Sequence, residues 1–382
     1  MTDSAREWLE RIHALPRPTG ATPLRVMNVC GGHERTLSMS GMRTLLPDYI
    51  ELIPGPGCPV CICPEEDVSL AIDMAMQHDI TLLTFGDMLR VPVNISAGEQ
   101  RAGRPRTLAQ AAASGADVHP IASPLEAIMM ARQNPARRFI FFAVGFETTM
   151  APIAAMLDQG LTNNLLLLLS GRRTWPAVAA LMSSGDAAFD ALIAPGHVAT
   201  IMGSDEWQFV TDQYRLPCAV AGFTSETLLA AIYSVLRQQH EQRCFLDNCY
   251  PELVTTQGNP SARTSLERQL DIGTAAWRGL GEIPASGYDL KPHWQDHDAR
   301  LHYPPDHHAR GRHERTMPPG CDCARVVCGQ IFPDQCRLYG THCTPATAVG
   351  PCMVSDEGAC HIWWQAGKRR HVEKDRVTAS LK

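Results

Sequence analysis

Short, almost continuously apolar runs recur along the first 280 residues and constrain the fold more than any other feature. Amphipathic or alanine-rich stretches of helical length separate these runs. Strands that are apolar on both faces are typical of parallel sheets covered by helices, whereas half-exposed strands alternate apolar and polar residues. The sequence therefore predicts an α/β fold with doubly wound parallel sheets. The expected strands are residues 25–30, 80–85, 139–144, 165–169, 191–194 and 218–222, and the expected helices include residues 68–77, 125–133, 148–157 and 226–238.

The chain is long enough for two or three domains, because its 382 residues exceed the usual domain size of ~100–200 residues. We expect a first α/β domain at residues 1–120 and a second at residues 121–280, the two units meeting near residues 115–135. Beyond them, residues 284–320 are rich in proline and histidine, which indicates a loop-rich connector. Residues 281–382 are thus expected to form this connector and a cysteine-rich C-terminal region.

Charge and hydropathy exclude several classes of protein. Lysine and arginine total 34 against 40 aspartates and glutamates, and this formal charge of -6 argues against a nucleic-acid partner. No apolar run approaches the ~18 residues of a membrane span, and the first residues lack the pattern of a secretory signal. We therefore expect a cytoplasmic protein, in which 14 cysteines indicate metal binding or redox chemistry rather than a disulfide framework.

A rigid loop carries the first chemical motif, PGPGCPVC at residues 54–61. Its glycines permit a tight turn and close approach of the backbone to a bound group, and its prolines stiffen the loop. The spacing of Cys58 and Cys61 brings two sulfurs within reach of one metal or of one disulfide. A redox pair, half of a zinc site and coincidence all remain open for this spacing alone. We interpret the nearby Cys63 as a small apolar core residue.

The second motif is CGGH, at the end of the first expected strand. Two glycines leave Cys30 approachable, and His33 is able to exchange a proton near neutral pH. A buried cysteine with a capping histidine is the alternative interpretation.

The C-terminal region holds the third group, formed by Cys336, Cys343, Cys352 and Cys360, with Cys323 as the main substitute. So many thiols in a loop-like segment indicate a metal site, although the spacing matches neither paired zinc knuckles nor a ferredoxin. We favour a [4Fe-4S] cluster over structural zinc.

These motifs together resemble the HypD family of hydrogenase maturation factors, over nearly the full length of the chain. The matching segments are VCGGH at 29–33, GPGCPVC at 55–61, RPRTL at 104–108, GADV at 115–118, GFETT at 145–149, PGHV at 195–198 and GPCMVSDEGAC at 350–360. The chain departs from the family pattern at Glu34, where a threonine is usual, and in its additional Cys63 and Cys328. The segment at 221–225 also lacks the family's usual acidic residue.

The resemblance implies two α/β domains with a cluster-bearing C-terminal region. It also implies a scaffold on which an iron with cyanide and carbonyl ligands is built for [NiFe]-hydrogenase. A small HypC-type partner shares that iron, and a HypE-type protein delivers the cyanide.

Within this reading, Cys30 is the main iron ligand, and Cys58 and Cys61 supply further thiolates or a redox dithiol. His33 is the expected proton carrier. Glu147 is the expected polar positioning group in the cleft between the domains. The alternative for Glu147 is a buried residue at the start of a helix. The alternative function is a free-standing iron–sulfur disulfide reductase that uses Cys58 and Cys61 as its dithiol. Infrared bands of cyanide and carbonyl distinguish the two functions, because a reductase has none.

Overall fold

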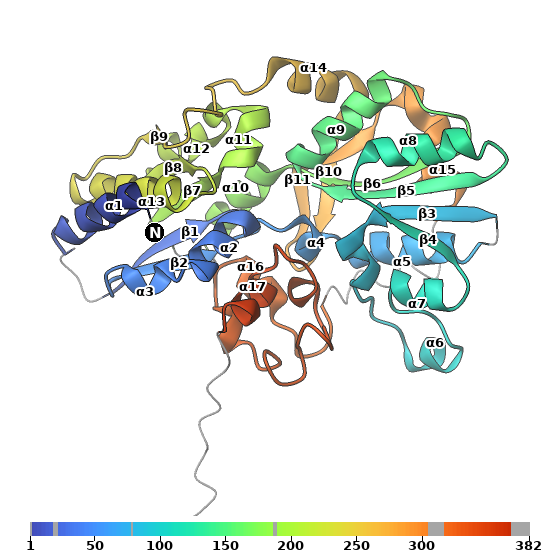
Figure 1. The fold of residues 1–382 in the computed structure, drawn as a ribbon, viewed down its shortest axis with the longest axis horizontal. Coiled ribbons are helices and arrows are strands. Elements are labelled where there is room, and N and C mark those ends of the chain that lie inside the picture. The colour runs from blue at the N-terminus through green and yellow to red at the C-terminus, as the bar shows by residue number, and fades with distance from the viewer. Residues whose placement is uncertain (1, 18–21, 78, 186–188, 305–316, 368–382) are drawn as a thin grey trace, which may run out of the picture.

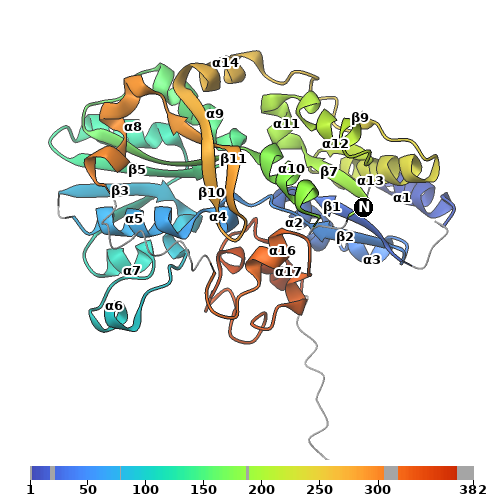
Figure 2. The ribbon, with the colours of Figure 1, turned by 180° about the vertical axis from the view of Figure 1, so that it is seen from behind.

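The computed structural model describes residues 2–17, 22–77, 79–185, 189–304 and 317–367. These residues form two sheets, each in a lobe of its own, and the C-terminal region lies against both lobes on one side (Figures 1 and 2). We call the lobe of the five-stranded sheet the first lobe and that of the six-stranded sheet the second lobe.

The sheet of the first lobe is parallel throughout, in the order β2-β1-β7-β8-β9. Its central strands are buried on both faces, as their apolar sequences predict. The bounds are Leu24–Asn28 for β1, Ile50–Pro54 for β2, Ala191–Pro195 for β7, Cys218–Ala221 for β8 and Leu246–Asn248 for β9.

The sheet of the second lobe has the order β10-β11-β6-β5-β3-β4. Its strands β4, β3, β5 and β6 are parallel, while β11 and β10 form an antiparallel hairpin on the β6 edge. The bounds are Ile80–Phe85 for β3, Asp117–Ile121 for β4, Arg138–Gly145 for β5, Leu165–Arg172 for β6, Leu270–Trp277 for β10 and Gly281–Leu290 for β11.

The α/β class and all six expected strands are confirmed, but the strands do not divide between the sheets at residue 120. The chain leaves the first lobe after β2, builds β3 to β6 of the second lobe, and returns with β7 to pair beside β1. It then crosses again to add β10 and β11. An apolar run shows that a strand is buried and does not show which strand it pairs with, so the sequence located the strands but not the boundary.

The expected connector begins too early, because residues 281–290 form strand β11. Glycine and proline interrupt this strand, and its outer positions are exposed, so it lacks the apolar pattern of the others. Residues 305–316 of that connector lie outside the described residues.

Helices cover both faces of each sheet, as is usual for parallel sheets. The four expected helices are confirmed as α5, α8, α9 and α13. The α-helices up to the second lobe's last parallel strand are α1 Asp3–Ala14, α2 Gly31–Met39, α3 Met42–Leu45, α4 Pro59–Ile62, α5 Glu65–Ala75, α6 Ala97–Arg101, α7 Leu108–Ala113, α8 Pro124–Gln133 and α9 Glu147–Asp158. The later ones are α10 Thr174–Ser184, α11 Gly196–Met202, α12 Gln208–Asp212, α13 Ser225–His240, α14 Pro260–Gln269, α15 Ala299–His302, α16 Cys323–Val327 and α17 Ala359–Gln365. The 3-10 helices are η1 Gly86–Arg90, η2 Ser204–Trp207, η3 Pro292–His297, η5 Pro333–Gln335 and η6 Pro351–Met353.

One apolar cluster joins parts of the molecule that lie far apart in the sequence. It contains the disulfide-bearing helix α4, one face of the second sheet, and the apolar side chains and cysteines of the C-terminal region. The C-terminal region therefore shares a core with the second lobe instead of standing apart as a separate globule.

Candidate thiol and metal centre

Cys30 lies where β1 ends and α2 begins, and its position depends on close backbone packing. The amide of Gly31 donates to the carbonyl of Gly57 at 3.1 Å, and the amide of Gly55 donates to the carbonyl of Asn28 at 2.8 Å. A Cβ on Gly57 would lie 2.4 Å from the Cys30 nitrogen, so only glycine fits there. The glycines of the rigid loop thus press it against the end of β1.

Cys58 and Cys61 form a disulfide across the short helix α4, with their Cα atoms 5.3 Å apart. Cys58 occupies the N-cap position and Pro59 the first helical position, where proline's missing amide costs no hydrogen bond. The rigid loop therefore presents the two sulfurs as a closed pair, one of the possibilities that the spacing left open.

A small cavity of about 20 Å³, roughly the space of one water molecule, brings the N-terminal motifs together. Cys30, Cys58 and Cys61 all line it, so the two motifs meet there. Cys352 and Glu357 of the C-terminal region line it as well, so two cysteine groups that are far apart in the sequence share one cavity. The full lining is Asn28, Cys30, Gly31, Glu34, Pro54, Gly55, Gly57, Cys58, Cys61, Val327, Cys352, Glu357 and Ala359.

The thiol of Cys30 is held in its protonated form by its surroundings. Loss of water around the sulfur raises its pKa to about 12, and the negative charge of Glu357 adds to this rise. The thiol must therefore release its proton to a base, or have it displaced by a binding metal ion, before the sulfur acts as a ligand.

His33 is fully buried and lies between the ends of strands β1 and β8. Its Nδ1 lies 3.0 Å from Oδ1 of Asn28, and its Nε2 lies 3.0 Å from the carbonyl oxygen of Ala221 at the end of β8. Burial lowers the pKa of the imidazole to about 3. The ring is therefore neutral at physiological pH and carries a single N–H, so it donates to only one of these two oxygens.

Glu147 begins α9, directly after β5, and is also fully buried. Its two carboxylate oxygens accept from the Thr174 amide at 2.6 Å and the Thr174 hydroxyl at 2.7 Å. Desolvation raises the pKa of this carboxyl group. Glu147 is not among the residues that line the cavity of Cys30; it fixes the start of α9 to the start of α10, a helix that also packs on the core of the first lobe.

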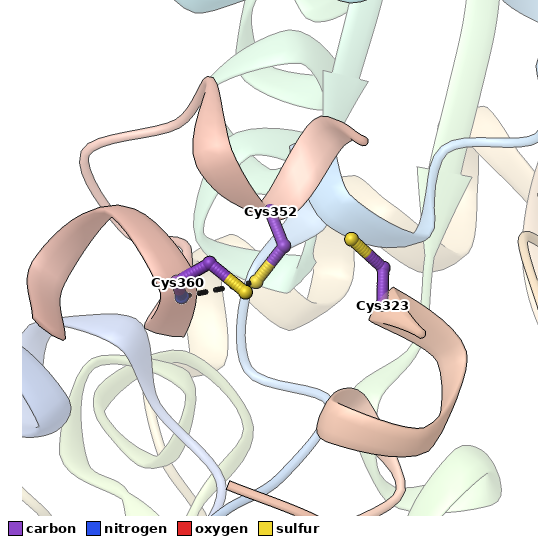
Figure 3. A group of neighbouring side chains, drawn as sticks. All are labelled: Cys323, Cys352 and Cys360. Carbon is purple, nitrogen blue, oxygen red and sulfur yellow. Dashed lines mark hydrogen bonds between the residues drawn. The ribbon is translucent and has the colours of Figure 1, made fainter. Parts of the chain in front are cut away.

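Three cysteine sulfurs of the C-terminal region converge within 4.8 Å of one another, from Cys323, Cys352 and Cys360 (Figure 3). Each comes from a different short helix, respectively α16, η6 and α17. Cys352 and Cys360 were expected in this group. Cys323 was the expected substitute, and the structure places it in the group.

Further cysteines surround this group of three. The Sγ atoms of Cys321 and Cys323 are 3.2 Å apart. Negative charge at Cys321 and Cys323 contributes to raising the pKa of Cys343, so those sulfurs lie within electrostatic reach of one another. Negative charge at Cys321 likewise contributes to raising the pKa of Cys336. Cys336 and Cys343 thus stand at the edge of the sulfur group and not within its 4.8 Å core.

The donor set fits a metal that prefers sulfur. The sulfurs of Cys323, Cys352 and Cys360 are buried, and thiol donation from the other two lowers the pKa of Cys352 well below its ordinary value. Gly350 leaves space for this crowding, because a Cβ there would lie 2.5 Å from the sulfurs of Cys321 and Cys323. Buried thiolates with more cysteines in reach suit an iron–sulfur cluster, and also zinc.

A buried polar contact that the sequence did not predict fastens the C-terminal region beside the cavity. Glu34 on α2 accepts from Nε1 of Trp363 on α17 at 2.7 Å and from Nη2 of Arg43 at 2.6 Å. The arginine also lies over the Trp363 ring, at 5.3 Å from its centroid. The departure from threonine at position 34 was the only signal in the sequence, and it did not indicate a partner.

Comparison with known proteins places the chain in a family. The family model described as "HypD: Hydrogenase formation hypA family" matches residues 3–367. The "Hydrogenase maturation factor HypD" of Escherichia coli K12 is 36% identical over 351 residues, covering 91% of this chain and 90% of that protein. The proteins of the same name from Rhodobacter capsulatus and Azotobacter vinelandii are each 36% identical over 379 residues, covering 97% of this chain and 97% and 96% of those proteins.

Among the helices of the described residues, none combines the length and the hydropathy that crossing a membrane requires. The matched segments contain the CGGH and GPGCPVC motifs together with the C-terminal cysteines, and the fold brings Cys30, Cys58, Cys61 and Cys352 to one cavity. The chain belongs to the HypD family of hydrogenase maturation factors.

Proposed function

We propose that this protein is the scaffold on which an Fe(CN)2CO unit is assembled for [NiFe]-hydrogenase. The iron is the cargo, and Cys30 is its main protein ligand. A small HypC-type partner supplies another ligand, and a HypE-type protein supplies the cyanide. The observation that carries the proposal is the cavity in which Cys30 meets the Cys58–Cys61 disulfide. Low-spin iron with diatomic ligands suits soft thiolate donors, which Cys30 provides once its proton is lost and which Cys58 and Cys61 provide once their disulfide is reduced.

The Cys58–Cys61 pair gives the scaffold a two-electron redox couple. Reduction breaks the S–S bond and adds two electrons and two protons to give the Cys58 and Cys61 thiols, and oxidation reverses each of these changes. The electrons come from an external reductant of low potential. When held by Cys323, Cys352, Cys360 and a fourth cysteine at the edge of the group, a [4Fe-4S] cluster supplies one-electron chemistry beside this cavity. Cys336 and Cys343 are the candidates for that fourth position.

The surroundings of Cys30 set the order of events at the iron ligand. Because its thiol is protonated, iron binding must release that proton, and the bound metal then stabilises the thiolate. His33 as carrier of this proton stays a prediction. It requires the ring to move away from Asn28 or Ala221, whose oxygens lie 3.0 Å from its two nitrogens. In the closed arrangement His33 fixes the ends of β1 and β8.

The partner in this proposal docks where the lobes and the C-terminal region meet. Glu147 is a positioning residue there, since it holds the ends of β5 and β6 together through Thr174. The Glu147→Gln variant, which keeps the size of the side chain, should weaken partner binding in a pull-down assay. Undiminished binding and hydrogenase maturation would remove Glu147 from the proposal.

A cytoplasmic location is part of the proposal. Among the described residues, 12 cysteines are free thiols, and two of the best exposed ones, Cys244 and Cys249, are not paired in a disulfide. Reducing conditions keep thiols in that state.

Infrared spectroscopy of protein purified anaerobically with its small partner tests the assignment. Cyanide and carbonyl stretching bands are expected for the unmodified protein. The Cys30→Ser variant should lose these bands and keep the visible absorption and iron of the C-terminal region. Cys244→Ser is the matched control, because that thiol is exposed and distant in the sequence, and it should keep the bands. Bands that persist in Cys30→Ser would contradict the role of Cys30.

A free-standing disulfide reductase is the second candidate, favoured by the closed Cys58–Cys61 pair. It predicts no cyanide or carbonyl bands in any preparation. It also predicts that Cys30→Ser retains the full rate of disulfide reduction, measured with an artificial electron donor and an acceptor disulfide.

A further inference from the structure

Beyond the ends of three neighbouring parallel strands of the first lobe stand a thiol, an imidazole and a phenyl ring (Figure 1). Cys30 follows β1, His197 follows β7 and Phe223 follows β8, each by two residues. The carboxyl ends of parallel strands meet at one edge of a sheet, which is where the ligand sites of α/β folds collect. The three side chains therefore lie at the edge where a ligand of this lobe would bind.

The ring of Phe223 lies against the backbone beside Cys30. A Cβ on Gly32 would lie 2.8 Å from Cε1 of Phe223 and 3.6 Å from Sγ of Cys30, so the ring edge and the sulfur are neighbours across that glycine. The second glycine of CGGH thus admits the ring, because a Cβ at position 32 would force the ring to move. Phe223 is not among the residues that line the cavity of Cys30, so it meets the sulfur outside that cavity.

Contacts on several sides fix Phe223 in this place. Its ring stacks on the imidazole of His197, with centroids 3.6 Å apart and planes inclined by 22°. The buried imidazole of His33 has its centroid 4.8 Å from that of the same ring. The carbonyl oxygen of Phe223 accepts from the hydroxyl of Thr36 on α2 at 3.0 Å. Packing and a backbone hydrogen bond of this kind hold a side chain in one rotamer, so the ring is a fixed wall beside Cys30.

The aromatic pair also reaches the molecular surface. His197 is exposed, and Phe223 and Cys30 are each half-buried. A reagent that approaches Cys30 past the ends of β7 and β8 therefore meets the stacked rings before it meets the sulfur.

We propose that Phe223, held in place by His197, determines the size of the groups that reach the Cys30 sulfur. The ring keeps large groups away and leaves the cavity, which the Cys58–Cys61 disulfide also lines, as the approach to the sulfur. That cavity of about 20 Å³ has room for a group about as large as one water molecule. The inference rests on the proposed function for the identity of the group that binds Cys30, and it adds the residues that restrict the size of that group.

The test is the rate of alkylation of Cys30 by N-ethylmaleimide and by the much larger fluorescein maleimide. Full-length protein purified anaerobically without its small partner is used, and mass spectrometry follows the peptide that contains Cys30. Both reagents attack the thiolate, so a change in the ionisation of the thiol cancels in the ratio of the two rates. Phe223→Ala should raise the rate of the large reagent relative to the small one at least about tenfold, because access to the thiolate controls its reactivity.

Phe245→Ala is the matched control. Phe245 is also a half-buried phenylalanine of the first lobe, but its ring lies against Arg243, at 5.3 Å from ring centroid to Cζ. This variant should leave the ratio of the two rates unchanged.

His197→Ala keeps the inference testable if Phe223→Ala fails to fold, because His197 is exposed. It should raise the ratio by about two- to tenfold, the factor by which loss of a stacked pair changes the population of a displaced ring. His197→Phe, which keeps a ring for stacking, should restore the original ratio. An unchanged ratio in folded Phe223→Ala, or in His197→Ala where only that variant folds, would overturn the inference. Absence of cyanide and carbonyl bands from the unmodified protein, with the ratios changing as expected, would instead contradict the proposed function alone.

Discussion

The two cysteine systems reach the same cavity by opposite routes. Cys30 and the Cys58–Cys61 pair stand at the ends of β1 and β2, where a regular parallel sheet and its loop hydrogen bonds fix the backbone. The C-terminal region at residues 317–367 contains short helices and isolated bridges, with cysteines filling its interior. In the first system the backbone positions the sulfurs. In the second, we expect a metal held by the sulfurs to position the backbone.

The largest expected effect therefore follows removal of metal from the C-terminal region. In Cys360→Ala, or after chelation, we expect amide hydrogen exchange within residues 317–367 to accelerate at least about a hundredfold, because metal binding supplies the folding free energy there. Exchange in β1, β5 and β6 should change little. Exchange measured by mass spectrometry checks this, with Cys328→Ala, outside the group of three sulfurs, as the control. Equal protection in metal-free and metal-loaded protein would abolish the contrast between the systems.

Loss of the Cys58–Cys61 disulfide should have the reverse consequence, because it should affect function and not folding. Cys61→Ser should end hydrogenase maturation while leaving iron content and the fold of both lobes unchanged. The cross-link closes a loop of four residues, so its loss should cost less than the roughly 3 kcal/mol typical of a 15-residue loop. Iron analysis, circular dichroism and a maturation assay on the same preparation make the measurement. Loss of cluster iron in this variant would mean that the rigid loop helps to hold the metal.

The buried His33 predicts sensitivity of the first system to acid. Its pKa is about 3 in the folded protein and near 6.5 in the unfolded chain, so between these values only the unfolded state binds the proton. Stability is thus complete above pH 6.5 and falls as the pH decreases, by about 2 kcal/mol between pH 6.5 and pH 5.

Urea denaturation at pH 7 and pH 5 measures this fall, and His33→Gln should reduce it. A pH profile that His33→Gln leaves unaltered would show that the imidazole is accessible to protons in the folded state.

The buried Glu206 should change the pH dependence of stability in the opposite direction. Burial raises its pKa to about 8, so its folded form retains a proton that the unfolded chain has lost. Glu206→Gln should therefore remove a loss of stability that grows as the pH rises from about 4.5 to about 8, measured by the same denaturation.

Loss of the contact between Glu34 on α2 and Trp363 on α17 should have a smaller effect on stability. Glu34→Gln leaves Arg43 without its carboxylate and weakens the acceptor for Trp363, at a cost of about 1–3 kcal/mol. Urea denaturation monitored by tryptophan fluorescence measures the loss. Ser38→Ala, which removes only one hydrogen bond to Glu34, should cost less. Equal losses in the two variants would show that the contact does not fasten α17.

The sequence predicted the first system better than the second for a physical reason. Strand ends follow from apolar runs, and glycines beside a cysteine indicate a backbone that approaches closely; the structure places Cys30, Cys58 and Cys61 around one cavity. The members of the sulfur group depend on how α16, η6 and α17 fold around one another, which no periodic pattern encodes. Cys323 was for that reason only a substitute in the prediction.

Residues that act through long-range contacts were missed for the same reason. The β10–β11 hairpin was missed because its glycines and exposed positions hide the strand pattern. His33 was predicted to carry protons because it follows Cys30 by three residues and imidazole titrates near neutral pH, and only the fold shows that Asn28 and Ala221 lie at its two nitrogens.

Replacement of Cys63 is expected to have the smallest effect. It tests whether the sulfurs of Cys30, Cys58 and Cys61 are the only ones that take part in the chemistry of the first system. It is fully buried two residues after Cys61, and its sulfur lies 3.6 Å from the hydroxyl of Ser170. Burial raises its pKa to about 12, with the charge of Asp67 adding to the rise, so the thiol stays protonated and unreactive. Cys63→Ala should cost roughly 1 kcal/mol for the lost sulfur and leave maturation intact. Alkylation mapping of oxidised and reduced protein should label Cys58 and Cys61 only after reduction, with or without Cys63. Failure of maturation in Cys63→Ala would mean that the third sulfur of this loop exchanges with the disulfide, and that burial alone does not keep it out of the chemistry.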